Sequence, residues 1–358
     1  MSNLSTLSFK QVAKFATTLF LAVSAISFLL QFFSKEMSSG RYLSYQQYSN
    51  KMADYYAVRE SVEAVTLGPS HSKAVHFQSL AVKGVSFYES FGDIEEAHFK
   101  FQRLIQETPK LRYVFIPLSP GSLALNNSNS SLDNNRLRNV LRNTPLLKLD
   151  YIRYANELFL NQLDYYMPIF DYQVLIRSNI SKYIRGGNNE FNDKDCFYNY
   201  SPNPKWLIEN GIVGGYNRNL MKPECISKYA KSTIKNHVNA FSKSLSKEYD
   251  VIEKNTQRLI EIADSLKKRG GSLVLFIPPI TREYYSSTEI QSFLPEHLSI
   301  LTNLAEHSAI QFYDYHDFFY KDLDTGVNDY FSDDDHLALP GAIKFSLAFK
   351  VKLDEHRY

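Results

Sequence analysis

The chain has 358 residues, of which 44% are hydrophobic and 14% aromatic, so it can bury a substantial core in one large domain or two ordinary ones. Its formal net charge of +2 argues against a general polyanion-binding protein, and we expect no nucleic acid among its partners. Its two cysteines, Cys196 and Cys225, lack clustered histidines and make a weak metal site, so we expect neither a metal nor a cofactor.

An uncharged apolar run near the N-terminus comes first. Residues 15–33 run for 19 positions without a charged side chain, which is near the ~20 residues that a membrane-spanning helix needs. A cleaved signal peptide is the alternative, because residues 22–25 are small, but the run continues well past them. Lys10 and Lys14 precede the run and favour a cytoplasmic N-terminus. The sequence therefore predicts a cytoplasmic tail and single-pass membrane anchor at residues 1–35, with the rest of the chain outside the cytoplasm.

Residues 36–60 are polar and rich in tyrosine, and we interpret them as a connector. An apolar run, residues 62–67, then leads into Gly68-Pro69 and Ser70. A strand, a sharp turn and a helix reaching Val82 would place Ser70 at the carboxyl edge of a parallel sheet, where open α/β sheets bind ligands. The alternative is an ordinary turn in which Ser70 caps a helix.

Strand-like and helix-like segments alternate along much of the remaining chain, a pattern typical of βαβ units. Further strands are expected at 85–91, 111–118, 272–277 and 310–315, and helices at 95–107, 251–268, 290–307 and 343–353. Five parallel strands with helices between them predict a flavodoxin-like doubly wound α/β sheet.

Residues 119–250 break that alternation, and we interpret them as an insertion into the sheet domain. Residues 146–183 are helical in character and crowded with aromatic side chains, whereas 186–228 are polar and irregular. Both cysteines lie in this insertion, and they could form a disulfide if the chain is exported.

The sequence Asp333-Asp334-Asp335-His336 stands just before the last expected helix. An acidic run before a helix is usually a solvated cap. Together with Ser70, however, it supplies the other groups that a serine nucleophile needs. His336 would take the proton of Ser70, while a carboxylate holds the imidazole in one tautomer. Asp334 and Asp335 compete for this orienting role, but the spacing favours Asp333.

These two motifs resemble those of the SGNH (GDSL-type) hydrolase superfamily, in which a nucleophilic serine follows the first strand and an Asp-x-x-His motif lies near the C-terminus. The chain is more closely similar to a membrane-anchored branch that includes the alginate O-acetylation proteins and the D-alanylation protein of teichoic acid. The resemblance implies an SGNH-like catalytic domain over residues 61–358. Two features depart from the family. Pro69 occupies the place of the usual Asp before the serine, and no clear Gly-x-Asn-Asp follows the third strand.

The resemblance implies an extracytoplasmic O-acyl(acetyl)transferase that acts on a cell-surface polysaccharide or cell-wall polymer. A polytopic membrane partner would supply the acyl group. The alternatives are a carbohydrate esterase or deacetylase, and a non-catalytic polymer-binding scaffold. Gly92 matches the family's oxyanion-binding glycine, and His71 is a candidate substrate contact beside the nucleophile. Asn126 and Asn127 are distant options for the missing oxyanion donor.

Overall fold

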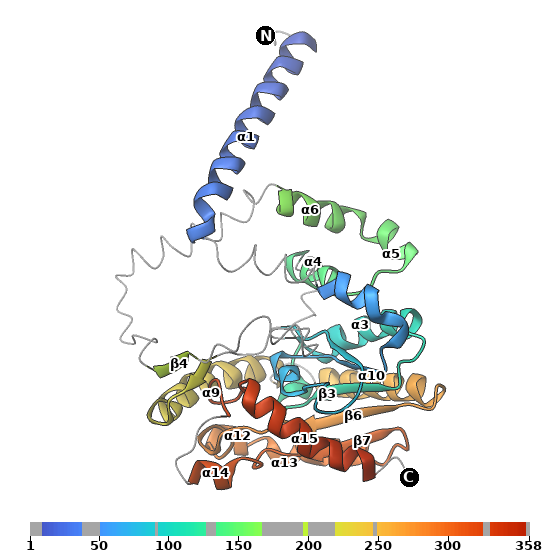
Figure 1. Cartoon of the computed structure of the whole chain (residues 1–358), viewed down its shortest axis with the longest axis vertical. Coiled ribbons are helices and arrows are strands. Elements are labelled where there is room, and N and C mark those ends of the chain that lie inside the picture. Colours follow the sequence, from blue (N-terminus) through green and yellow to red (C-terminus); the bar gives the residue numbers. More distant parts are fainter. Residues whose placement is uncertain are drawn as a thin grey trace. The chain divides into compact units, whose positions relative to one another are not determined.

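A computed structural model describes residues 9–37, 51–89, 92–126, 134–166, 196–199, 219–245, 249–324 and 330–355, with elements labelled as in Figure 1. The chain divides into two compact units. We call residues 1–50 and 148–190 the helical unit, and residues 51–147 and 191–358 the sheet unit.

The described part of the helical unit consists of α1 (Phe9–Met37), α5 (Lys148–Arg153) and α6 (Ala155–Tyr166). Residues 15–33 lie within α1, but no helix among the described residues is both long enough and apolar enough to cross a bilayer. The structure therefore does not support the membrane span that the sequence predicts.

Five parallel strands form the centre of the sheet unit. They are β1 (Ala64–Thr66), β2 (Gly84–Ser86), β3 (Tyr113–Pro117), β6 (Ser272–Ile277) and β7 (Ile310–Asp314). Their order is β2-β1-β3-β6-β7, and every neighbouring pair is parallel. This is one of the two common orders of doubly wound sheets. The predicted α/β class and parallel sheet are confirmed.

Helices cover both faces of this sheet (Figure 1). The long ones are α3 (Ile94–Glu107), α10 (Tyr249–Lys267), α13 (Leu294–Leu304) and α15 (Leu339–Glu355). Successive strand residues point to opposite faces. Val114 and Leu275 therefore pack with α3, α10 and α13, whereas Phe115 and Phe276 pack with α15. With both faces covered, the central strands are apolar almost throughout, as buried parallel strands must be.

Two predicted helices differ from the structure. After Ser70 there is only the short 3₁₀ helix η2 (Ser70–Ala74), and turns follow it. Ala81 has a φ of 54°, which an α-helix does not allow, so the predicted helix to Val82 is wrong. The segment expected as one helix at 290–307 is divided into α12 (Thr288–Gln291) and α13. Pro295 lies in the first turn of α13, where it favours a new helix start over continuation.

The remaining named elements connect this framework. They are η1 (Arg59–Ser61), η3 (Ser122–Ala124), α4 (Asn134–Arg142), β4 (Phe197–Asn199), β5 (Asn219–Met221), α9 (Pro223–Leu245), α11 (Arg282–Tyr285) and α14 (Tyr320–Asp324). Tyr55, in the expected connector, is fully buried, and its hydroxyl lies 2.8 Å from Thr108 Oγ1. The core of the sheet unit therefore includes residues before position 61.

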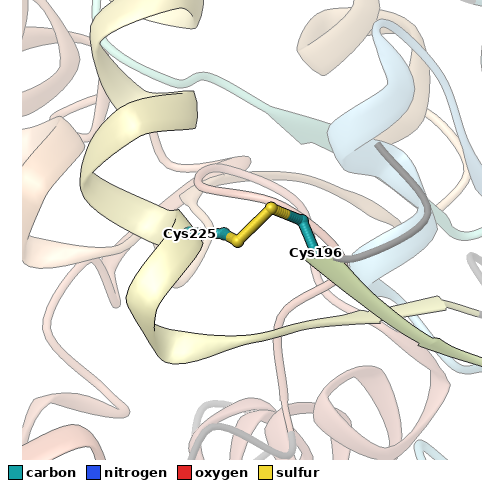
Figure 2. The surroundings of a disulfide bond; sticks show 2 residues. All are labelled: Cys196 and Cys225. Carbon is teal, nitrogen blue, oxygen red and sulfur yellow. A yellow bond between two sulfur atoms is a disulfide. The ribbon is translucent and has the colours of Figure 1, made fainter. Parts of the chain in front are cut away.

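A disulfide links two parts of the predicted insertion (Figure 2). It joins Cys196, just before β4, to Cys225 in the first turn of α9, and β4 pairs with β5 antiparallel. The pairing that the sequence left open is thus present. The rest of the insertion between α6 and β5, at 167–195 and 200–218, lies outside the described residues.

Candidate active site

Ser70 stands at the exit of β1, on a tight turn. Gly68 has a φ of 100°, a left-handed conformation that glycine adopts without strain, and Pro69 then leads into η2. Hydrogen bonds fix the turn: Glu89 N donates to Gly68 O at 3.0 Å, and Ser72 Oγ donates to Leu67 O at 2.9 Å. The turn therefore presents the Ser70 hydroxyl at the carboxyl edge of the sheet.

His336 lies on the loop between α14 and α15, and backbone bonds close this loop on itself. Ser332 N donates to His336 O at 2.9 Å, and Ala338 N donates to Tyr330 O at 2.8 Å. Thr281, which follows β6, donates from both its backbone nitrogen and its hydroxyl to Asp334 O, at 3.1 and 2.6 Å. The loop is therefore tied to the same edge of the sheet as Ser70.

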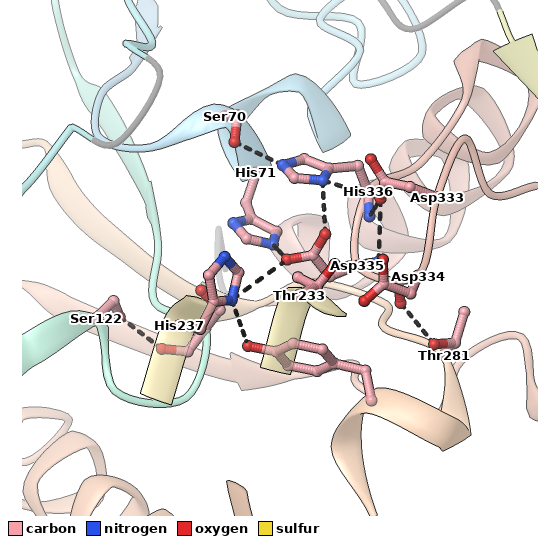
Figure 3. A network of polar contacts seen from close by, with 12 residues as sticks. Ser70, His71, Ser122, Thr233, His237, Thr281, Asp333, Asp334, Asp335 and His336 are labelled. Carbon is pink, nitrogen blue, oxygen red and sulfur yellow. Dashed lines mark hydrogen bonds and ion pairs between the residues drawn. The ribbon is translucent and has the colours of Figure 1, made fainter. Parts of the chain in front are cut away.

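The side chains of Ser70 and His336 meet, although 266 positions separate them (Figure 3). Ser70 Oγ lies 2.6 Å from His336 Nε2. That distance is within hydrogen-bond reach of a nucleophile and its general base. The base can accept a proton at Nε2 only if Nδ1 carries the hydrogen.

Two carboxylates face Nδ1 of His336. Asp333 Oδ1 lies 3.0 Å from it and Asp335 Oδ1 lies 2.7 Å from it. Acceptors at Nδ1 favour the tautomer that leaves Nε2 free to take a proton. Asp333 therefore lies where the sequence predicts. Asp335 contacts the same nitrogen, although from the sequence it was considered only as a rival for the orienting role.

The charges of this cluster are strongly coupled. Burial lowers the pKa of His336, but the carboxylates of Asp333 and Asp335 outweigh it and raise that pKa well above its ordinary value. Burial likewise opposes ionisation of Asp335. The facing rings of His336 and His71 nevertheless hold the pKa of this carboxyl well below its ordinary value. The site thus combines a strengthened base with an ionised, buried acid.

His71 is buried beside His336. Its ring stacks on that of His336, with centroids 4.5 Å apart and planes 11° from parallel. His71 Nε2 lies 3.2 Å from Asp335 Oδ2, and only 6% of the side chain is exposed. From the sequence, His71 was expected to contact substrate. Its buried position beside Asp335 instead favours a role in positioning that carboxylate.

Asp334 points away from His336. Its Oδ1 accepts a hydrogen bond of 2.9 Å from Thr233 Oγ1 on α9. Burial, together with the charges of Asp335 and Asp333, raises the pKa of Asp334 to about 8. This carboxyl is therefore largely protonated at neutral pH and is a structural group.

Two further residues at the site were not expected from the sequence. His237 on α9 has its Nδ1 2.8 Å from the hydroxyl of Tyr284 on α11 and 3.8 Å from Asp335 Oδ2. Thr233 and His237 are four residues apart, a spacing that places them on one face of a helix. This spacing is the sequence signal that could have identified the two residues. They were not considered because α9 falls within the predicted insertion.

The expected oxyanion donors are less well placed. The N–H of Gly92 donates to Glu89 O at 3.0 Å and is therefore engaged in a turn. Gly92 does pack against the nucleophile turn, because a Cβ there would lie 2.9 Å from Gly68 O. Asn126 lies just beyond η3, and Asn127 falls outside the described residues.

Within the described residues, two side-chain groups are close enough to hold a metal ion. They are His71, Asp335 and His336, and the three aspartates Asp333, Asp334 and Asp335. A metal ion on the first group would compete with the contacts that join His336 to its carboxylates. In the second group, the raised pKa of Asp334 weakens it as a ligand. The hydrogen bonds and ion pairs described above account for the closeness of both groups.

Comparison of the chain with protein-family models, curated proteins and solved structures finds no match. The likeness to the SGNH superfamily therefore rests on the chain's own motifs.

Proposed function

We propose that this chain is a serine-dependent acyl-ester enzyme of the SGNH type, built on a flavodoxin-like sheet. One observation carries the proposal: Ser70 Oγ lies 2.6 Å from His336 Nε2, while carboxylates face the other imidazole nitrogen. The candidate nucleophile therefore contacts the candidate base, and the base contacts the orienting acid, which is the spatial arrangement that a serine hydrolase requires.

In the proposed reaction, Ser70 Oγ attacks the carbonyl carbon of an ester while His336 Nε2 takes its proton. The tetrahedral intermediate collapses, the bond to the leaving alcohol breaks, and His336 returns the proton to that alcohol. A second hydroxyl then attacks the acyl-serine in the reverse sense. Water as the acceptor gives an esterase, whereas a sugar hydroxyl gives an O-acyltransferase.

We favour transfer to a hydroxyl of a cell-surface polysaccharide or cell-wall polymer, with the acyl group delivered by a polytopic membrane partner. The support is the resemblance of the two end motifs to the polymer-modifying branch of the superfamily. The Cys196–Cys225 disulfide adds to it, because disulfides are typical of oxidising, extracytoplasmic compartments.

A non-catalytic, polymer-binding scaffold is the second candidate. The observation in its favour is the N–H of Gly92, which is engaged with Glu89 O instead of being free to stabilise an oxyanion. Loss of one oxyanion donor typically costs ~10²–10³ in rate.

Labelling with a fluorophosphonate probe separates the two candidates. We expect the purified chain to be labelled and Ser70→Ala to be unlabelled. Ser265→Ala, a substitution at a half-buried position on α10, should be labelled like the wild type. An unlabelled wild-type chain that also fails to hydrolyse 4-nitrophenyl acetate would favour the scaffold. Adding a short oligosaccharide and measuring acylated sugar against free acetate then distinguishes transfer from hydrolysis.

A further inference from the structure

Asp335 has the surroundings of a group that positions both histidines. Its side chain is only 2% exposed. One carboxylate oxygen lies 2.7 Å from His336 Nδ1, and the other lies 3.2 Å from His71 Nε2. The stacked rings and the carboxylate therefore form one buried cluster, seen beside Ser70 in Figure 3.

Asp333 is arranged differently. Its side chain is 33% exposed, and its Oδ1 is shared among three donors. These are His336 N at 2.7 Å, Asp335 N at 3.1 Å and His336 Nδ1 at 3.0 Å. Two of the three bonds hold the backbone of the loop. Exposure to water also weakens the attraction between a carboxylate and a charged imidazole.

We propose that Asp335, the residue directly before His336, is the principal carboxylate that positions the catalytic imidazole, and that His71 holds Asp335 in place. Asp333 then acts mainly on the backbone of the loop. This inference rests on the proposed function and refines the Asp-x-x-His assignment of that site.

His71 contributes through its ring nitrogen and its ring face. His71 Nε2 and the second carboxylate oxygen of Asp335 form a buried ion-pair contact of 3.2 Å, while the first oxygen lies beside His336 Nδ1. The stacked face limits the tilt of the His336 ring. His71 thus acts through Asp335 and His336, and it is a positioning residue.

Charged and titratable groups from several elements act on His336 or on the carboxylates beside it. They are Asp333 and Asp335 from its own loop, His71 and Lys73 from η2, His237 from α9 and Tyr284 from α11. A test of Asp335 must therefore compare variants that leave the other groups unchanged.

The matched pair Asp335→Asn and Asp333→Asn provides that comparison. Both substitutions are isosteric and remove one charge, and the amide that replaces the Asp333 carboxylate keeps a carbonyl oxygen for the two backbone bonds. We expect Asp335→Asn to lower kcat by on the order of 10³-fold with little change in KM. Asp333→Asn should lower it by about 10-fold or less, and Asp334→Asn, the control in the same loop, should retain wild-type kcat. His71→Phe keeps a stacked ring but removes the nitrogen, and we expect an intermediate loss.

A second measurement does not depend on turnover. The pKa of His336 is followed by NMR titration of the histidine-labelled chain, with the signal assigned by its absence from His336→Gln. Asp335→Asn should lower this pKa more than Asp333→Asn does, and His71→Phe should lower it by less than Asp335→Asn. Thermal unfolding identifies any variant that fails to fold. If an aspartate variant does not fold, the pKa of His336 in His71→Phe is compared with that in the wild type instead.

The two proposals fail in different ways. An unreactive wild type defeats the proposed function but leaves the NMR comparison intact. A reactive wild type in which Asp333→Asn has the larger effect on kcat and on the pKa of His336 overturns the role of Asp335. A His71→Phe variant with wild-type kcat and an unchanged pKa of His336 overturns the role of His71.

Discussion

The hydroxyl of Ser70 and the imidazole of His336 are expected to act as a unit, because each is chemically weak without the other. Ser70→Ala and His336→Ala should each lower ester turnover by on the order of 10⁵–10⁶-fold, and the double variant should be little worse than either. Steady-state kinetics measure this. Effects that multiply in the double variant would show that the two side chains act independently.

The raised pKa of His336 predicts the pH dependence of turnover. Only the neutral imidazole can accept the Ser70 proton, and Asp333 and Asp335 raise the pKa of His336 well above 6.5. The value of kcat/KM should therefore increase with pH through a transition above 6.5, the ordinary pKa of the side chain. A pH–rate profile measures it. Full activity already reached below pH 6 would contradict the charge arrangement.

Asp334 makes a separate prediction about stability. Its pKa is about 8 in the folded chain and near 3.8 when unfolded, so between these values the folded state holds a proton that the unfolded state releases. The stability contributed by this group is present at low pH and is lost as the pH rises from about 4 to 8. The Asp334→Asn variant does not lose this stability as the pH rises, because the amide of asparagine does not titrate.

Thermal unfolding of Asp334→Asn and wild type at several pH values tests this. The melting temperature of the variant should rise relative to that of the wild type between about pH 5 and 8. A difference that stays constant with pH would show that Asp334 is ionised in the folded chain.

Among the elements, α9 brings the insertion to the candidate active site, because it carries Thr233 and His237. The disulfide fixes the first turn of this helix to the start of β4. Replacing both cysteines by alanine should lower the free energy of unfolding by about 2–4 kcal/mol, since the cross-link restricts the unfolded chain. Chemical denaturation measures this loss. Two thiols that alkylate readily in the native, unreduced wild type would contradict the cross-link.

The nucleophile turn is the second element on which the site depends. Gly68 needs its left-handed backbone to reverse the chain after β1, and Gly92 must be small because it packs on the Gly68 carbonyl. A larger residue would be strained at Gly68 by its backbone conformation and would clash at Gly92 with the Gly68 carbonyl. Both glycines therefore support the turn on which the sequence predicts the nucleophile. The structure does not favour the oxyanion-binding role expected for Gly92, because its N–H already donates a hydrogen bond within a turn.

Across the whole molecule, the local pattern located the five strands of the sheet, although β2 ends at Ser86 where the sequence predicts a strand to residue 91. Residues 272–277 are predicted as a strand with the bounds of β6, and the parallel α/β class follows from the alternation of strands and helices. Predicted helices failed where one residue changed the backbone, at Ala81 with its left-handed φ and at Pro295. The membrane span depended on apolar composition alone, and the described helices do not support it.

The sequence by itself determined the fold class and the two short motifs that carry Ser70 and His336, because strand periodicity and motif spacing are local properties of the chain. The motifs also predicted that Ser70, His336 and Asp333 meet, but only the tertiary structure decided which further groups join them. Asp335 faces two imidazoles because the fold brings η2 beside the loop before α15, and His237 faces Asp335 because α9 lies beside that loop. The contact between His71 and Asp335 joins residues 264 positions apart, and no local pattern encodes such a distance.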